Sequence, residues 1–326
     1  MKKLFVFFLT IGLLLTGCTN AAKNTMKDGD EKLEVYTTVY PLQYFAEQIG
    51  GDYVNVNTIY PTGADEHTFE PTQKDMIKLA DADMFIYIGL GLEGFVEKAK
   101  TTLKNENVKM VGAGENIHIE ATEHEEEDGE HDEHGDHDEH GDHEDDGHHH
   151  HGDIDPHVWI DPIYAKDLAQ AISTAFAEKM PEYKEQFEEN YATLSKELDQ
   201  LNSDFEKVIA ESKHKEIIVS HAAFGYWEKR YGLKQISVAG LNTSNEPTHK
   251  QLEKIITTAK QYDLKYVFFE QNVNSKLTEI IQKEIGAEPL VLHNLSVLTD
   301  NDLKNDPSYF SLMEMNLKAL ETALNN

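Results

Sequence analysis

Histidines and carboxylates gather between residues 120 and 162, where the chemistry of the chain is most concentrated. The tract Glu123–Asp153 holds ten histidines and sixteen acidic residues and almost nothing apolar, so it cannot build a core and is expected to be a disordered loop. An acidic spacer would not need imidazole, whereas His-rich tracts bind metals. Low-affinity metal binding is therefore predicted for His124, His131, His134, His137, His140, His143, His148, His149, His150 and His151.

Three other histidines lie beside apolar segments and belong to folded structure. His157 precedes a Val-Trp-Ile run, His67 follows a predicted strand and its loop, and His221 comes directly after another predicted strand. In open α/β sheets, ligands bind beyond the carboxyl ends of the strands, where loops converge. Three imidazoles meeting there would suit tetrahedral Zn²⁺, with nitrogen at about 2.0–2.1 Å. A manganese or magnesium site would be expected to contain more carboxylates.

The fourth ligand of such a site is open. Glu66 is adjacent to His67 and could supply an oxygen, and water is an alternative. Glu270 and His293 each follow an apolar strand, and either could instead orient an imidazole. Three histidines and one water also describe a catalytic zinc. That alternative requires a general base and a substrate pocket, and the sequence contains no His-Glu-x-x-His motif.

The elements that must position these residues alternate between strand and helix. In the first half we predict strands at 33–40, 54–60, 84–90 and 108–111, with helices beginning at Pro41 and spanning 71–82 and 92–105. In the second half we predict strands at 217–220, 235–239, 266–269 and 290–292, with helices at 224–231, 248–262 and 275–285 and one from Ser308. Such alternation favours an α/β fold with two βα lobes and mostly parallel sheets covered by helices.

A pair of helices is expected to join the two lobes. Asp161 caps and Pro162 opens a helix that is interrupted near Pro181. An amphipathic helix follows, and about thirty residues at 1.5 Å each make it about 45 Å long, enough to run rigidly along both lobes. A coiled-coil dimer is the competing interpretation. The predicted boundaries are 32–162 for the first lobe, including the loop 120–153, 163–213 for the linker helices, and 214–326 for the second lobe.

The N-terminus has the pattern of a secreted, anchored protein. Lys2 and Lys3 precede the apolar run Leu4–Leu15, which is too short to span a bilayer and indicates a signal peptide over residues 1–17. Cys18 is the single cysteine, so no intramolecular disulfide is expected. The sequence Leu-Thr-Gly-Cys ending at Cys18 resembles a bacterial lipobox, which implies an acylated cysteine, a lipidated tether at 18–31 and anchoring in membrane lipid.

The overall charge argues against nucleic acid as a partner. The formal net charge is −31, and although sixteen of the acids lie in the tract, the folded remainder is still acidic and would repel phosphates.

Four motifs of this chain form a recognisable set: Gly63-Ala-Asp-Glu-His-Thr-Phe-Glu-Pro71, Asp155-Pro-His-Val-Trp-Ile-Asp-Pro162, Val219-Ser-His-Ala-Ala-Phe-Gly-Tyr-Trp227 and Phe268-Phe-Glu-Gln-Asn272. Together they resemble one family, the metal-binding lipoproteins of bacterial zinc ABC importers, which carry Zn²⁺ or Mn²⁺. The resemblance implies that His67, His157 and His221 are ligands, and the third histidine points to zinc. It also implies a non-enzymatic, monomeric protein that captures extracytoplasmic zinc at the outer face of the cell membrane and delivers it to an ABC permease.

The chain departs from the family pattern at one position. Many relatives place an acidic fourth ligand in the segment matching His293–Leu298, where this chain has Ser296. Glu66, Glu270, His293 and Ser296 are thus the candidates, either for the fourth ligand or for a residue that orients an imidazole. A manganese-binding protein, a surface adhesin or metal buffer, and a three-histidine zinc hydrolase are the competing functions.

Overall fold

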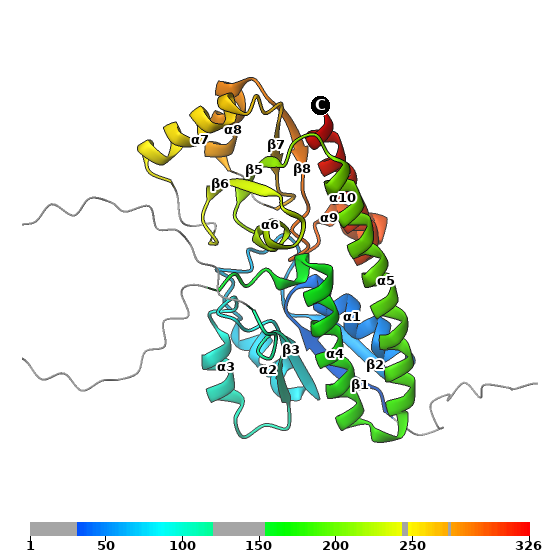
Figure 1. Ribbon diagram of the computed structural model, residues 1–326. Coiled ribbons are helices and arrows are strands. Elements are labelled where there is room, and N and C mark those ends of the chain that lie inside the picture. Colours follow the sequence, from blue (N-terminus) through cyan, green and yellow to red (C-terminus); the bar gives the residue numbers. More distant parts are fainter. Residues whose placement is uncertain (1–30, 120–153, 243–246, 273–274) are drawn as a thin grey trace, which may run out of the picture. The chain divides into compact units, whose positions relative to one another are not determined.

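Two parallel four-stranded sheets form the framework of the computed structural model, which describes residues 31–119, 154–242, 247–272 and 275–326. The first sheet has the strand order β2-β1-β3-β4, and the second has the order β6-β5-β7-β8. Both sheets therefore follow one topology, and all of their strand pairs are parallel. The predicted α/β fold with two similar lobes is confirmed (Figure 1). The signal peptide, Cys18 and the histidine tract lie outside the described residues.

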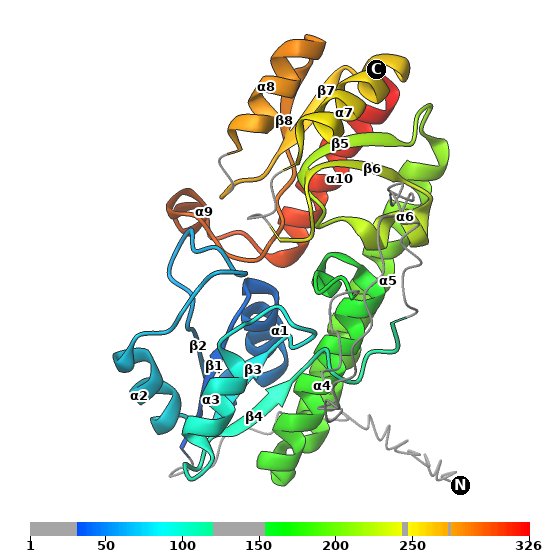
Figure 2. The same ribbon diagram turned by 90° about the vertical axis from the view of Figure 1, so that its left-hand side faces the viewer.

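The first lobe is built on a sheet with helices on both faces. Its strands are β1 Leu33–Thr37, β2 Val54–Thr58, β3 Met84–Tyr87 and β4 Lys109–Gly112, and its helices are α1 Tyr40–Gly50, α2 Gln73–Asp81 and α3 Val96–Leu103, with a short 3-10 turn η1 at Gly51–Tyr53. Figure 2 shows α2 and α3 on one side of the sheet and α1 on the other. Every residue of β3 is buried, because a central parallel strand is covered on both faces.

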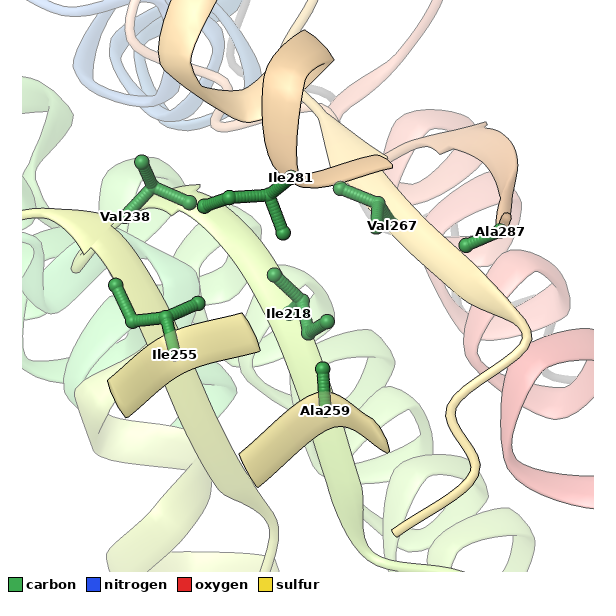
Figure 3. Close-up of a cluster of buried hydrophobic side chains, with 7 residues drawn as sticks. All are labelled: Ile218, Val238, Ile255, Ala259, Val267, Ile281 and Ala287. Atoms are coloured by element: carbon green, nitrogen blue, oxygen red, sulfur yellow. The ribbon is translucent and has the colours of Figure 1, made fainter. Parts of the chain in front are cut away.

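The second lobe repeats this plan. Its strands are β5 Glu216–His221, β6 Lys234–Ala239, β7 Tyr266–Phe269 and β8 Glu288–Val291, and its helices are α6 Gly225–Tyr231, α7 His249–Gln261, α8 Lys276–Ile285, α9 Asp300–Asn305 and α10 Tyr309–Asn325. Aliphatic side chains of α7 and α8 pack against those of β5, β6 and β7 (Figure 3). Ile218 and Val267 in this core are fully buried, so the two central strands are fixed at the point where their carboxyl ends reach the site.

Two helices connect the lobes. Asp161 caps α4 (Pro162–Lys179) by accepting hydrogen bonds from the backbone N–H groups of its first turn, and the 3-10 turn η3 (Pro181–Tyr183) leads into α5 (Lys184–Glu211). The 28 residues of α5 correspond to about 42 Å. Helix α5 packs on its partner α4, on α1 of the first lobe, and on α6 and α10 of the second (Figure 1). The predicted helix along both lobes is confirmed.

The structure differs from the prediction at several element ends. Strand β2 ends at Thr58, because the backbone N–H of Tyr60 turns to bond the Thr58 hydroxyl. Helix α3 begins only at Val96. Helix α9 was not predicted, although Thr299 and Asp302 form a capping box at its start. None of the helices within the described ranges is long and apolar enough to cross a membrane.

Candidate metal centre

Three imidazoles and one carboxylate meet where the two lobes face each other. Each of Glu66, His67, His157 and His221 offers one ligand atom, and these four atoms lie within 4.8 Å of one another. His67 and Glu66 lie in the loop after β2, His157 directly precedes the 3-10 turn η2 (Val158–Ile160), and His221 is the last residue of β5. Glu66, His157 and His221 are buried. The structure thus brings together the three predicted histidines and one of the candidates for the fourth ligand.

The spacing of the ring nitrogens fits a small tetrahedral ion. The Nε2 atom of His157 lies 3.2 Å from Nε2 of His67 and 3.3 Å from Nε2 of His221. A tetrahedron with zinc–nitrogen bonds of 2.0–2.1 Å has edges of about 3.3 Å. The donor set of three imidazoles and one carboxylate is also one that zinc accepts.

In both His157 and His221, a carboxylate fixes which ring nitrogen faces the cluster. The Nδ1 atom of His157 lies 2.7 Å from Oδ1 of Asp155, and Nδ1 of His221 lies 2.5 Å from Oε1 of Glu270. An ionised carboxylate can only accept a hydrogen bond, so each Nδ1 carries the hydrogen. In the neutral rings, the Nε2 atoms of His157 and His221 then present lone pairs to each other. Two buried lone pairs that face each other at this distance repel, and either a proton on one ring or a bound metal cation relieves that repulsion.

The segment that carries His157 is held by helix α6. The Tyr226 hydroxyl donates to the backbone oxygen of Asp155, and Trp227 Nε1 donates to that of Ile160 at 3.0 Å. Gly225 starts this helix, and a Cβ placed on it would meet Oδ2 of Asp155 at 2.9 Å. Any larger residue at this position would therefore make the Asp155 carboxylate shift.

Glu270 orients His221 from inside the second lobe. Its Oε1 also accepts a hydrogen bond from the Ser220 hydroxyl at 2.5 Å, and its Oε2 accepts one from Asn294 Nδ2 at 2.8 Å. Burial alone would raise the pKa of Glu270, but His221 and these two hydrogen bonds outweigh burial and lower that pKa. Burial alone would lower the pKa of His221, but Glu270 outweighs it and raises that pKa.

The loop after β2 supplies the remaining two groups. The backbone N–H of His67 donates to Asp65 Oδ1 at 2.9 Å, and the Tyr60 hydroxyl donates to the backbone oxygen of Glu66 at 3.3 Å. Burial, reinforced by the neighbouring histidines, lowers the pKa of His67 to about 3, so this ring is neutral and ready to bind metal. Burial raises the pKa of Glu66, and a cation beside it would favour its ionised form.

Two of the predicted candidates do not reach the cluster. Nδ1 of His293 accepts the backbone N–H of Leu295 at 3.0 Å, and Nε2 lies 3.3 Å from Asp302. The ring is thus committed to its own loop and to α9. The Ser296 hydroxyl donates to Asn294 Oδ1 at 2.9 Å. His293 and Ser296 therefore lie outside the group of four residues whose ligand atoms come together, and other hydrogen bonds hold them.

Sequence reasoning missed Asp155 and Asn294. Asp155 stands two residues before His157, and this short spacing was a usable signal, because an Asp side chain readily bonds the backbone two residues on; here Oδ1 accepts the backbone N–H of His157 at 2.9 Å. Asn294 gave no such signal, since its partners Glu66 and Glu270 are distant in sequence.

The fold and the site together define a two-lobed α/β protein with a candidate metal centre where its lobes meet. The family model described as zinc-uptake complex component A, periplasmic, matches residues 35–323. The chain belongs to this family.

Named relatives agree with this placement. The zinc-binding lipoprotein AdcA of Streptococcus pneumoniae is 35% identical over 323 residues, which cover 98% of this chain and 61% of that protein. This chain therefore spans about three fifths of the length of that relative. The high-affinity zinc uptake system protein ZnuA of Bacillus subtilis is 34% identical over 314 residues, which cover 96% of this chain and 94% of that protein.

A solved structure extends the similarity to three dimensions. The Zn(II)-bound ZnuA-like domain of S. pneumoniae AdcA superposes with a TM-score of 0.72 at 31% identity, covering 90% of this chain and 100% of that domain.

Proposed function

We propose that this chain is the extracytoplasmic zinc-binding component of a zinc ABC importer. It captures Zn²⁺ between its two lobes and delivers the ion to a membrane permease. The observation that carries this proposal is the convergence of His67, His157, His221 and Glu66 from separate elements on one point. Family membership and relatives named for zinc binding and zinc uptake support it.

Binding rather than catalysis is the role that this ligand set favours. A catalytic zinc keeps one coordination position open for water or substrate, whereas a site closed by four protein groups does not. Glu66 completes such a closed set with the three imidazoles. Three nitrogens and a single carboxylate also favour zinc over manganese, which prefers oxygen ligands.

The N-terminal sequence supports a location for this function at the outer face of the cell membrane. We propose that Cys18 is acylated after removal of residues 1–17 and that it anchors a monomeric protein to the outer face of the cell membrane. The histidine tract within 120–153 would add weaker metal binding. These residues lie outside the described part of the chain.

Metal analysis tests the proposal directly. Protein without the tract, purified without added metal, should contain one tightly bound zinc per chain, measured by elemental mass spectrometry. Replacing His67, His157 or His221 by Ala should each weaken zinc binding at least about tenfold, because each removes a direct ligand. Glu66→Gln should weaken it as well. Zinc affinity that is unchanged in all four variants would overturn the proposed site.

A further inference from the structure

One amide side chain lies between the two carboxylates of the metal centre. Asn294 follows β8 and is fully buried. Its Nδ2 donates to Glu270 Oε2 at 2.8 Å, and it also lies 3.5 Å from Glu66 Oε1 and 3.4 Å from Asn272 Oδ1. Glu270 belongs to the second lobe and Glu66 to the loop after β2 in the first, so a single NH₂ group faces acceptors from both lobes.

The orientation of this amide is fixed by its other end. Oδ1 of Asn294 accepts hydrogen bonds from the Ser296 backbone N–H at 3.1 Å, from the Ser296 hydroxyl at 2.9 Å and from Gln271 Nε2 at 2.8 Å. A flipped amide would turn its NH₂ toward these donors and its oxygen toward two carboxylates. The network therefore leaves one orientation, in which the NH₂ group points at Glu66 and Glu270.

The same residue is also tied to the segment that carries His157. Its backbone oxygen accepts the Trp159 Nε1 hydrogen at 2.7 Å, and the Trp159 ring packs edge-on against the His157 ring. Asn294 thus contacts one residue beside each histidine. These residues are Glu270, which bonds His221, Glu66, which precedes His67, and Trp159, which packs on His157.

We propose that Asn294 is a positioning residue for metal binding, and that its amide holds Glu270 on His221 and keeps Glu66 Oε1 beside the three imidazoles. This inference rests on the proposed function. The Glu66 oxygen that lies 3.5 Å from the amide is also the one that lies 4.0 Å from Nε2 of His67, so the amide contacts this carboxylate on the side of the metal centre. Three imidazoles and one carboxylate oxygen held in this way form a four-coordinate set, which suits Zn²⁺ and disfavours Mn²⁺ with its larger set of oxygen ligands.

Two substitutions at this position test the proposal. Asn294→Asp keeps the shape but removes both amide donors, and Asn294→Ala removes the amide without adding charge. Asn105→Asp and Asn105→Ala are the matched controls, because Asn105 is exposed in the turn after α3. Each variant, once its fold is checked by circular dichroism, is titrated with Zn²⁺ and Mn²⁺ against a chelator. The visible spectrum of its Co²⁺ complex reports the coordination geometry.

We expect both Asn294 variants to lose about 10- to 100-fold in zinc affinity, the usual effect of removing a partner of a metal ligand. Their preference for Zn²⁺ over Mn²⁺ should narrow, and their Co²⁺ absorption should weaken as the geometry departs from tetrahedral. Both Asn105 variants should match the unsubstituted protein. Folded Asn294 variants with unchanged zinc affinity and an unchanged Co²⁺ spectrum would overturn this inference alone. Failure of the unsubstituted protein to bind zinc would overturn the proposed function and this inference together.

Discussion

The Nδ1 atom of His221 and Oε1 of Glu270 lie 2.5 Å apart in a fully buried pair. This contact sets the tautomer of the ring, since the carboxylate can only accept a hydrogen, and it turns Nε2 toward the other two histidines. Glu270 directly follows the neighbouring strand β7. The basicity of His221 therefore depends on a residue that this strand positions.

Replacing this carboxylate should weaken the metal centre without removing a direct ligand. We predict that Glu270→Gln lowers zinc affinity about tenfold or more, because an amide accepts a weaker hydrogen bond from Nδ1 and leaves the ring less basic. Chelator competition measures the effect, and exposed Glu284→Gln is the control. Equal affinities in the two variants would show that Glu270 does not support the site.

A single methyl group at Gly225 should disturb His157 through Asp155. The added Cβ would lie 2.9 Å from Asp155 Oδ2, closer than atoms pack, so the carboxylate must move away from its ring. We predict that Gly225→Ala weakens zinc binding about tenfold. Gly94→Ala is the matched control, because nothing lies within 4 Å of a Cβ at that position. Identical zinc affinities of the two variants would argue against an effect of residue 225 on His157 through Asp155.

Zinc binding should weaken in acid, and His221 sets where this begins. A metal binds only the neutral ring, so a proton on His221 must be displaced as the ion enters. Despite burial, Glu270 raises the pKa of His221, so proton competition should appear at a higher pH than for an ordinary imidazole and grow as the pH falls. His67, with a pKa of about 3, should not compete in this range. Affinities measured between about pH 5 and 8 should therefore decline toward the acid end, and a flat profile would contradict a three-histidine site.

Measuring zinc affinity against pH in Glu270→Gln isolates the contribution of the His221–Glu270 pair. Without the carboxylate the pKa of His221 should fall, so the acid weakening should begin at a lower pH than in the unsubstituted protein.

A buried carboxylate away from the metal should give the metal-free fold its own pH dependence. Glu93 accepts hydrogen bonds from the Thr38 hydroxyl and from the backbone N–H groups of Ile88 and Gly89, and burial raises its pKa from 4.5 to about 7. The folded state then holds this proton more tightly than the unfolded state. Its stabilising contribution is complete below pH 4.5 and is lost as the pH rises through about 7.

Glu93→Gln should remove this dependence. Relative to the variant, the unsubstituted chain should lose about 3 kcal/mol of unfolding free energy between pH 4 and pH 8, as follows from a shift of this size. Urea unfolding in the presence of a chelator measures the difference, with exposed Glu106→Gln as the control. Parallel stability curves for the unsubstituted chain and Glu93→Gln would contradict the raised pKa.

Removing the histidine tract should separate its metal binding from that of the cleft. We predict that deletion of residues 123–153 lowers the total zinc bound and leaves one tight zinc per chain. Isothermal titration on both forms gives the stoichiometry. Loss of the tight site on deletion would instead make the tract the primary binding element.

Much of the fold followed from local patterns. The strands and helices of both lobes were predictable because apolar periodicity and turn residues mark them, and the long helix α5 has a buried stripe that includes Leu194, Leu198 and Phe205. Helix α9 escaped prediction because it is six residues long and none of its residues is buried, so it has no apolar period to detect.

From the sequence alone, His67 and His221 could be selected because each follows a predicted strand, where ligands of α/β folds bind, and His157 because it stands beside apolar residues. The meeting of these residues from two separate sheets, and the neighbours that orient each ring, came only from the packing of the lobes. Leu295 has a left-handed backbone, with a φ of +61°, and this turn sends Asn294 toward the carboxylates while His293 and Ser296 bond within their own surroundings. A non-glycine residue in that conformation leaves no mark in the sequence, because surrounding contacts and not its own preference hold it there.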